Sequence, residues 1–179
     1  MNMKTIGTKA WLGAGTMMLA LAPAAAKDTT FDRDIRWGRH LIATSGCNDC
    51  HTPGYLMKDG HVPEPEWLAG DAMGWQGPWG TTYPANLRLL FSAMTEQQWL
   101  VRARQPFRPP MPGASLRHMS NAELKAIFRY VKSLPVKGKL APAYVPPGGQ
   151  VITPYFDLTP KNLPAVGASK PSARRAQGD

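Results

Sequence analysis

The feature that most constrains the fold is a long stretch without periodicity, from His51 to about Thr95. It is rich in glycine and proline. Several large aromatic residues in it follow neither a helical nor a strand spacing, namely Trp67, Trp75, Trp79 and Tyr83. Loops of this length are uncommon inside compact domains, because ordering them costs conformational entropy that burial must offset. The stretch therefore indicates that something other than polypeptide organises it.

Helical patterns flank this stretch. Residues 31–44 place apolar side chains on one face and precede Ser45-Gly46, which predicts a first helix. Two capping boxes, Thr95-Glu-Gln-Gln98 and Ser120-Asn-Ala-Glu123, predict a short second helix and a longer terminal helix that closes at Leu134-Pro135. No strand pattern is recognisable, so we expect an all-α domain of three or more helices.

The two ends of the chain are expected to lie outside this domain. Residues 1–26 indicate an export signal, because Lys4 and Lys9 precede an apolar run followed by small residues up to Ala26. A run of about twelve apolar residues is shorter than the roughly 20 of a membrane span, so an uncleaved anchor is the weaker alternative. Residues 27–135 form the predicted domain, 136–168 a Pro-rich extension packed on it, and 169–179 a disordered tail. Cleavage near Ala26 would leave a mature protein without a membrane span, periplasmic in a Gram-negative source.

The charge is unevenly distributed. Removing Lys4 and Lys9 with the signal lowers the formal net charge from +9 to +7. Residues 28–71 hold eight acidic and four basic side chains, whereas residues 100–139 hold nine Lys or Arg and only Glu123. Export argues against nucleic acid as the partner of this basic half. We expect it to dock an acidic protein face, or to be a solvated surface only.

Cys47 and Cys50, the two cysteines of the chain, lie in the segment Cys47-Asn-Asp-Cys-His51. A thiol–disulfide exchange pair normally starts a helix after a strand, and no strand is expected here. Zinc would need two further ligands. The available histidines are His40, His61 and His118.

A third interpretation uses every residue of the motif, because C-x-x-C-H is the attachment sequence of haem c. Both sulfurs bond to one porphyrin edge, which places the imidazole of His51 under the ring to bind iron. A covalent haem would also supply the apolar centre around which the aperiodic stretch folds.

The second iron ligand is expected to be Met111. It lies among the prolines of Pro109-Pro-Met-Pro112, which restrict the backbone and hold the thioether in place. Met94 and Met119 precede helix caps, where an apolar residue usually packs against its own helix. His118, Met119 and an open site remain alternatives. Weaker rivals are Met57, Met73, His40 and His61.

These motifs resemble the single-haem class I c-type cytochromes. The match covers residues 31–135 and consists of a helix leading into SGCNDCH, the loop PPMPG and the terminal helix NAELKAIFRYVKSLP. The segment WGTTYPANL followed by PPMPG is also similar to the cytochrome domains that accompany periplasmic alcohol and aldehyde dehydrogenases. The resemblance implies a small cytochrome c fold, with three or more helices around one covalent haem c.

The resemblance also implies roles for single residues. Cys47 and Cys50 would form the thioether bonds, and His51 and Met111 would be the axial ligands. The carbonyl of Pro53 would accept a hydrogen bond from His51 and fix its orientation. The pocket near the propionates would be lined by Trp79, Tyr83 and Asn86. Gly38 would lie where the first and last helices cross, opposite Tyr130 or Phe128. Two departures are the long extension and Gly113, which stands where the family has an aromatic residue.

His/Met ligation leaves iron no position for a substrate, so we expect an electron carrier and not an enzyme. Its partners would be redox proteins with acidic docking faces: a dehydrogenase, a membrane cytochrome complex or an oxidase. One alternative is an electron-transfer subunit of a periplasmic dehydrogenase complex, with the extension as an interaction arm. The other, if Met111 does not bind iron, is an open-site haem peroxidase or gas sensor.

Overall fold

The computed structural model of this chain describes residues 29–163. In this range six α-helices are combined with a three-stranded mixed sheet. The prediction of an all-α fold is therefore wrong, because the described part of the chain is a mixture of helices and strands. The predicted signal segment 1–26 and the tail 169–179 lie outside the described residues.

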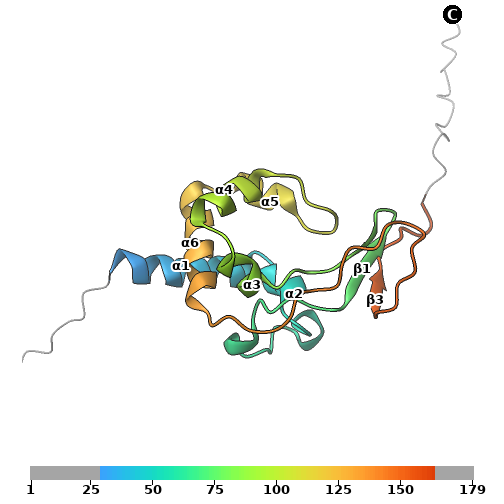
Figure 1. The fold of residues 1–179 in the computed structure, drawn as a ribbon, viewed down its shortest axis with the longest axis horizontal. Helices are drawn as coiled ribbons and strands as arrows, with labels where there is room; N and C mark the ends of the chain where they lie inside the picture. Colours follow the sequence, from blue (N-terminus) through green and yellow to red (C-terminus); the bar gives the residue numbers. More distant parts are fainter. Residues whose placement is uncertain (1–28, 164–179) are drawn as a thin grey trace, which may run out of the picture.

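The first and last helices, α1 (Thr30–Thr44) and α6 (Asn121–Ser133), cross at the helical end of the molecule (Figure 1). Gly38 lies at the crossing. A Cβ atom there would stand 2.0 Å from the carbonyl oxygen of Ala126 and 2.8 Å from the Cβ of Tyr130. The predicted glycine contact between these helices, with Tyr130 opposite, is confirmed.

Both predicted capping boxes begin a helix. Thr95 caps α4 (Glu96–Arg104) and Ser120 caps α6. In each box the cap hydroxyl accepts from the backbone N–H three residues later, and that residue's side chain accepts from the N–H of the cap. These reciprocal bonds satisfy donors that a helix start otherwise leaves unpaired, which is why the two starts could be predicted.

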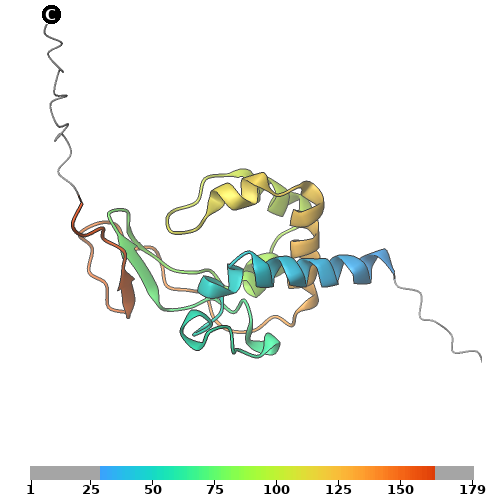
Figure 2. The same ribbon diagram turned by 180° about the vertical axis from the view of Figure 1, so that it is seen from behind.

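The aperiodic stretch contains more regular structure than predicted. It holds two 3-10 turns (Leu56–Lys58 and Glu64–Glu66), the strands β1 (Gly74–Gly77) and β2 (Gly80–Thr82), and helix α3 (Leu87–Ser92). β1 pairs antiparallel with β2 and parallel with β3 (Tyr155–Asp157), which comes from the C-terminal extension. The sheet lies at the opposite end of the molecule from the α1–α6 crossing (Figures 1 and 2).

The hydrophobic core lies among the helices. Its largest fully buried side chains include Phe91, Ile42 and Leu124. The ring of Phe91 stacks on Phe128 with centroids 5.5 Å apart, and the indole N–H of Trp99 donates to the carbonyl of Leu124 at 2.8 Å. Within residues 29–163, no helix has both the length and the apolar character needed to cross a membrane.

Candidate haem site

The CNDCH segment forms a short helix of its own, α2 (Cys47–His51), directly after α1. Gly46 makes the connection with φ of +71°, a left-handed backbone that glycine adopts without strain. Residues three and four positions apart lie on the same side of a helix. The helical conformation of α2 therefore directs Cys47, Cys50 and His51 to one side, which explains the spacing of the motif.

The two thiols are partly buried and form no disulfide within the described residues. Burial raises the pKa of Cys47 to about 11, and burial also raises the pKa of Cys50. Both are therefore protonated at neutral pH, whereas exchange pairs depend on a thiol of lowered pKa. Within residues 29–163, no three His, Cys, Asp or Glu side chains are grouped to hold a metal ion.

Cys50 borders a small cavity near the sheet. The same cavity is lined by Trp75 of β1 and Phe156 of β3. These two rings pack with centroids 4.9 Å apart. The extension thus brings an aromatic side chain close to Cys50 of the CNDCH segment.

His51 is buried, with 9% of its surface exposed, and its Nδ1 lies 2.7 Å from the carbonyl oxygen of Ala85. A carbonyl can only accept, so Nδ1 carries the hydrogen and Nε2 of the neutral ring keeps its lone pair. Burial lowers the pKa of His51, while the Ala85 bond acts in the opposite direction, so the net shift favours the neutral ring. The site therefore presents a metal-binding nitrogen in the correct tautomer.

The acceptor of this hydrogen bond differs from the prediction, which placed it at Pro53. Thr52 is extended, with φ of −119° and ψ of 120°, and carries the chain away from the ring, so that Pro53 is exposed. Ala85 lies 34 residues further along the chain and precedes α3. The orientation of His51 is thus set by tertiary packing and not by its own loop.

A frame of buried hydrogen bonds holds the backbone around His51. The N–H of Gly70 donates to the carbonyl of His51 at 2.8 Å. The hydroxyl of Thr52 accepts from the N–H of Leu68 at 2.8 Å and donates to the side-chain oxygen of Asn48 at 2.7 Å. Gly70 has φ of +74°, and a Cβ there would lie 2.6 Å from the nitrogen of Asn86, so only glycine permits this approach.

Met111 lies in a turn before α5 (Gly113–His118), partly buried against the same core cluster as Cys47. We call residues 108–112 the Met loop. The N–H of Met111 donates to the carbonyl of Arg108 at 3.2 Å. The hydroxyl of Thr82, on β2, donates to the carbonyl of Pro109 at 2.7 Å. The loop is therefore fastened both internally and to the β1–β2 hairpin.

The rival ligands lie in different surroundings. Met57 is 73% exposed, and His118 is exposed at the end of α5. His40 and His61 are also exposed. Met94 and Met119 pack against the core next to their helix caps, as the sequence predicts. Met73 is partly buried and lines the cavity that borders Cys50. Met111 combines partial burial with a loop held by hydrogen bonds to Arg108 and Thr82.

The three residues predicted to line the propionate pocket differ in their hydrogen bonds. The indole N–H of Trp79 is buried and has no hydrogen-bond partner among the described residues. The hydroxyl of Tyr83 lies 2.7 Å from that of Thr153 in the extension. Asn86 donates its amide to the carbonyls of residues 137 and 139, at 2.8 and 3.2 Å. Trp79 thus keeps a donor for an acidic group, whereas the amide of Asn86 is engaged.

An unpaired buried N–H costs roughly 1–3 kcal/mol, so the indole of Trp79 is ready for a hydrogen-bond acceptor that residues 29–163 do not supply. The side-chain amide nitrogen of Asn48, inside the CNDCH motif, is likewise buried without a partner among the described residues. Two thiols on one side of a short helix and the free Nε2 of His51 on the same helix are the donor set of a covalently attached haem. No protein-family model, curated protein or solved structure matches the chain.

Two residues that support the site have no signal in the sequence. They are Ala85 and Tyr144. Tyr144, from the extension, donates its hydroxyl to the carbonyl of Trp79 at 2.7 Å, and the guanidinium of Arg108 lies 4.1 Å from its ring centroid. Tyr144 therefore links the Met loop to the segment that carries the unpaired indole. Because these contacts join distant segments, no local pattern could reveal them.

Proposed function

We propose that this protein is an exported electron carrier with one haem c, attached through Cys47 and Cys50 and ligated by His51 and Met111. The observation that carries the proposal is His51, whose hydrogen bond to Ala85 leaves Nε2 free on the same short helix as the two thiols. The group, when bound, supplies an iron that gains and loses single electrons, and His/Met ligation favours its reduced state.

The chain's own contribution is to keep both ligands still. Ala85 fixes the tautomer and ring plane of His51, and Thr82 fastens the Met loop. Hydrogen bonds to metal-binding side chains fix their orientation and tune the metal. The core around α2 limits the access of water, which disfavours the oxidised, more highly charged state.

A basic face beside the Met loop is the proposed docking site for an acidic redox partner. Arg102, Arg108 and Arg117 are exposed there. Arg104 is committed within the protein, since its guanidinium donates to the carbonyls of residues 116 and 117. Association should weaken as salt rises, because exposed charges are screened. We expect Arg108→Gln to lower the association rate and its dependence on salt, and a rate indifferent to ionic strength would contradict the docking site.

The experiment that tests the proposal is absorption spectroscopy of the full chain, produced with a haem c maturation system. We expect sharp low-spin bands in both oxidation states, a far-red iron–sulfur band when oxidised, and no response to carbon monoxide. Met111→Ala should abolish the far-red band and admit carbon monoxide. Met57→Ala is the matched control, because Met57 is 73% exposed, and it should leave the spectrum unchanged.

Two results would overturn the proposal. A chain without covalent haem would remove the cofactor, and with it the function. A high-spin spectrum that shifts with carbon monoxide in the native chain would remove Met111 from the iron and favour the peroxidase or gas-sensor alternative.

A further inference from the structure

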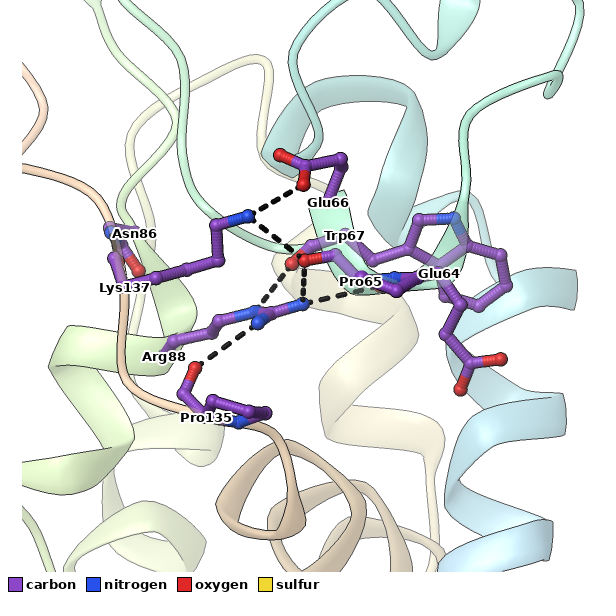
Figure 3. Close-up of polar contacts among 8 residues, drawn as sticks. All are labelled: Glu64, Pro65, Glu66, Trp67, Asn86, Arg88, Pro135 and Lys137. Atoms are coloured by element: carbon purple, nitrogen blue, oxygen red, sulfur yellow. Dashed lines mark hydrogen bonds and ion pairs between the residues drawn. The ribbon is translucent and has the colours of Figure 1, made fainter.

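Arg88 places a buried positive charge next to the site. Its side chain belongs to α3, and the residue is 2% exposed. The guanidinium donates to four backbone carbonyls (Figure 3). Its Nε reaches Trp67 at 2.7 Å, Nη2 reaches Pro65 at 3.0 Å and Glu64 at 3.2 Å, and Nη1 reaches Pro135 at 3.1 Å.

These acceptors belong to different parts of the chain. Residues 64–67 come from the segment between α2 and β1, and Pro135 is where the extension leaves α6. Lys137 approaches the same segment from the extension, with its Nζ 2.7 Å from the carboxylate of Glu66 and 3.1 Å from the carbonyl of Pro65 (Figure 3). One buried guanidinium therefore joins α3, this segment and the start of the extension.

Asn86 makes the second connection. Its side-chain oxygen accepts from the N–H of Leu89 at 3.1 Å and so caps α3, while its amide donates to the carbonyls of Lys137 and Lys139. Asn86 is 3% exposed, so its donor side of these bonds is buried. We call Asn86, Arg88 and Lys137 the polar junction.

The polar junction lies immediately next to the acceptor of the His51 hydrogen bond. Ala85 precedes Asn86, and the N–H of Leu87 donates to the carbonyl of Leu68 at 3.0 Å. The segment around Leu68 also holds the backbone of His51, through Thr52. The polar junction thus fixes the Ala85 carbonyl and the imidazole in one frame.

We propose that Arg88 and Asn86 are positioning residues for His51, which couple docking of the C-terminal extension to the orientation of the imidazole. The inference rests on the proposed haem site. Its physical basis is the cost of unpaired donors: if the extension withdraws, the carbonyls of Pro135, Lys137 and Lys139 leave, and buried N–H groups of Arg88 and Asn86 lose their acceptors. Residues 85–88 must then move to find new ones.

The test uses the haem-loaded full chain and the variant Asn86→Ser. Serine caps helices about as well as asparagine, so α3 keeps its start, but its short side chain cannot reach the carbonyls of Lys137 and Lys139. Thr153→Val is the matched control, because it removes an extension contact, to Tyr83, that does not pass through the polar junction. The readouts are the hydrogen exchange of the His51 Nδ1–H, followed by NMR, and the reduction potential.

We expect Asn86→Ser to accelerate exchange of the His51 Nδ1–H about tenfold, because the two hydrogen bonds from the Asn86 amide to the extension are lost. The reduction potential should shift as well. Thr153→Val should change neither. Lys137→Met, at a half-buried side chain, is a second variant in case Asn86→Ser does not fold, and it should accelerate exchange in the same direction.

The inference is overturned if Asn86→Ser and Lys137→Met fold and bind haem but leave the Nδ1–H exchange rate and the reduction potential unchanged. It is also overturned if Thr153→Val changes both quantities as much as these variants do. Failure of the proposed function has a different signature, because the native chain would then carry no covalent haem.

Discussion

Replacing Gly38 with alanine should destabilise the protein, although alanine is the better helix former. The new Cβ would stand 2.0 Å from the carbonyl oxygen of Ala126 and 2.8 Å from the Cβ of Tyr130. The first of these atoms belongs to the backbone of α6 and cannot rotate away. The two helices must therefore separate or slide, and their packed faces lose contacts.

Two opposing terms decide the size of the effect. Alanine is favoured over glycine in a helix interior by about 1 kcal/mol. Inserting an extra methyl group into a packed interface costs typically about 1–3 kcal/mol, and a clash with rigid backbone belongs at or above the upper end. The expected net loss is about 2 kcal/mol, which lowers the melting temperature of a chain of this size by about 4–8 °C.

The assay is thermal unfolding of the haem-loaded chain, followed by circular dichroism. His40, an exposed position on the same helix, supplies the calibration. His40→Ala should be more stable than His40→Gly by about 1 kcal/mol, the propensity term alone. If Gly38→Ala is stabilised by that same amount, the helices do not approach at Gly38 and the reasoning fails.

Two further predictions concern a helix cap and the Met loop. The backbone N–H and the hydroxyl of Ser120 both donate to Glu123 and hold the pKa of that carboxyl below its usual value. The native chain should therefore be more stable than Glu123→Gln above about pH 4.3, the pKa of a glutamate in the unfolded chain. This advantage should vanish as the pH falls through the lower pKa of Glu123 in the folded protein. Urea unfolding across this pH range measures the difference. Gln98→Ala is the control, because Gln98 closes the Thr95 capping box without a charge, and its loss of stability should not depend on pH. Thr82→Val removes the bond to Pro109, worth about 1 kcal/mol, so added imidazole should displace the iron-bound thioether about five times more readily. An unchanged affinity for imidazole would contradict the fastening of the Met loop.

The helices could be predicted because their signals are local. Thr95 and Ser120 each face a partner three residues later, and the resulting bonds form within a single turn. The CNDCH segment is local in the same sense, since its five residues fold as one short helix. Gly38 was also recognisable, because a glycine inside an amphipathic helix needs a packing reason.

The sheet could not be predicted for the opposite reason. β1 is Gly-Trp-Gln-Gly, which has no alternating pattern, and its parallel partner β3 comes from the far end of the chain. Strand preference depends on neighbours across the sheet, and here these neighbours are remote in sequence. The all-α prediction failed at this point.

The hydrogen bond that orients His51 could not be predicted for a third reason. Its acceptor is a backbone carbonyl, which every residue has, so the identity of Ala85 carries no information. Arg88 likewise shows no pattern, because its four acceptors are carbonyls brought together by the fold. The surroundings of His51 could be learned only from the structure, whereas its proposed role as an iron ligand rests on its neighbours in the CNDCH motif.

The place of Phe156 implies an order of events in biogenesis. Pairing of β3 with β1 joins segments separated by most of the domain, and contacts of such long range form late in folding. Once formed, this pairing places Phe156 at the cavity that borders Cys50. If the proposed haem is attached, the thiols are therefore most accessible to a maturation enzyme before the extension pairs with β1, and completion of the sheet then places Phe156 beside the attached group.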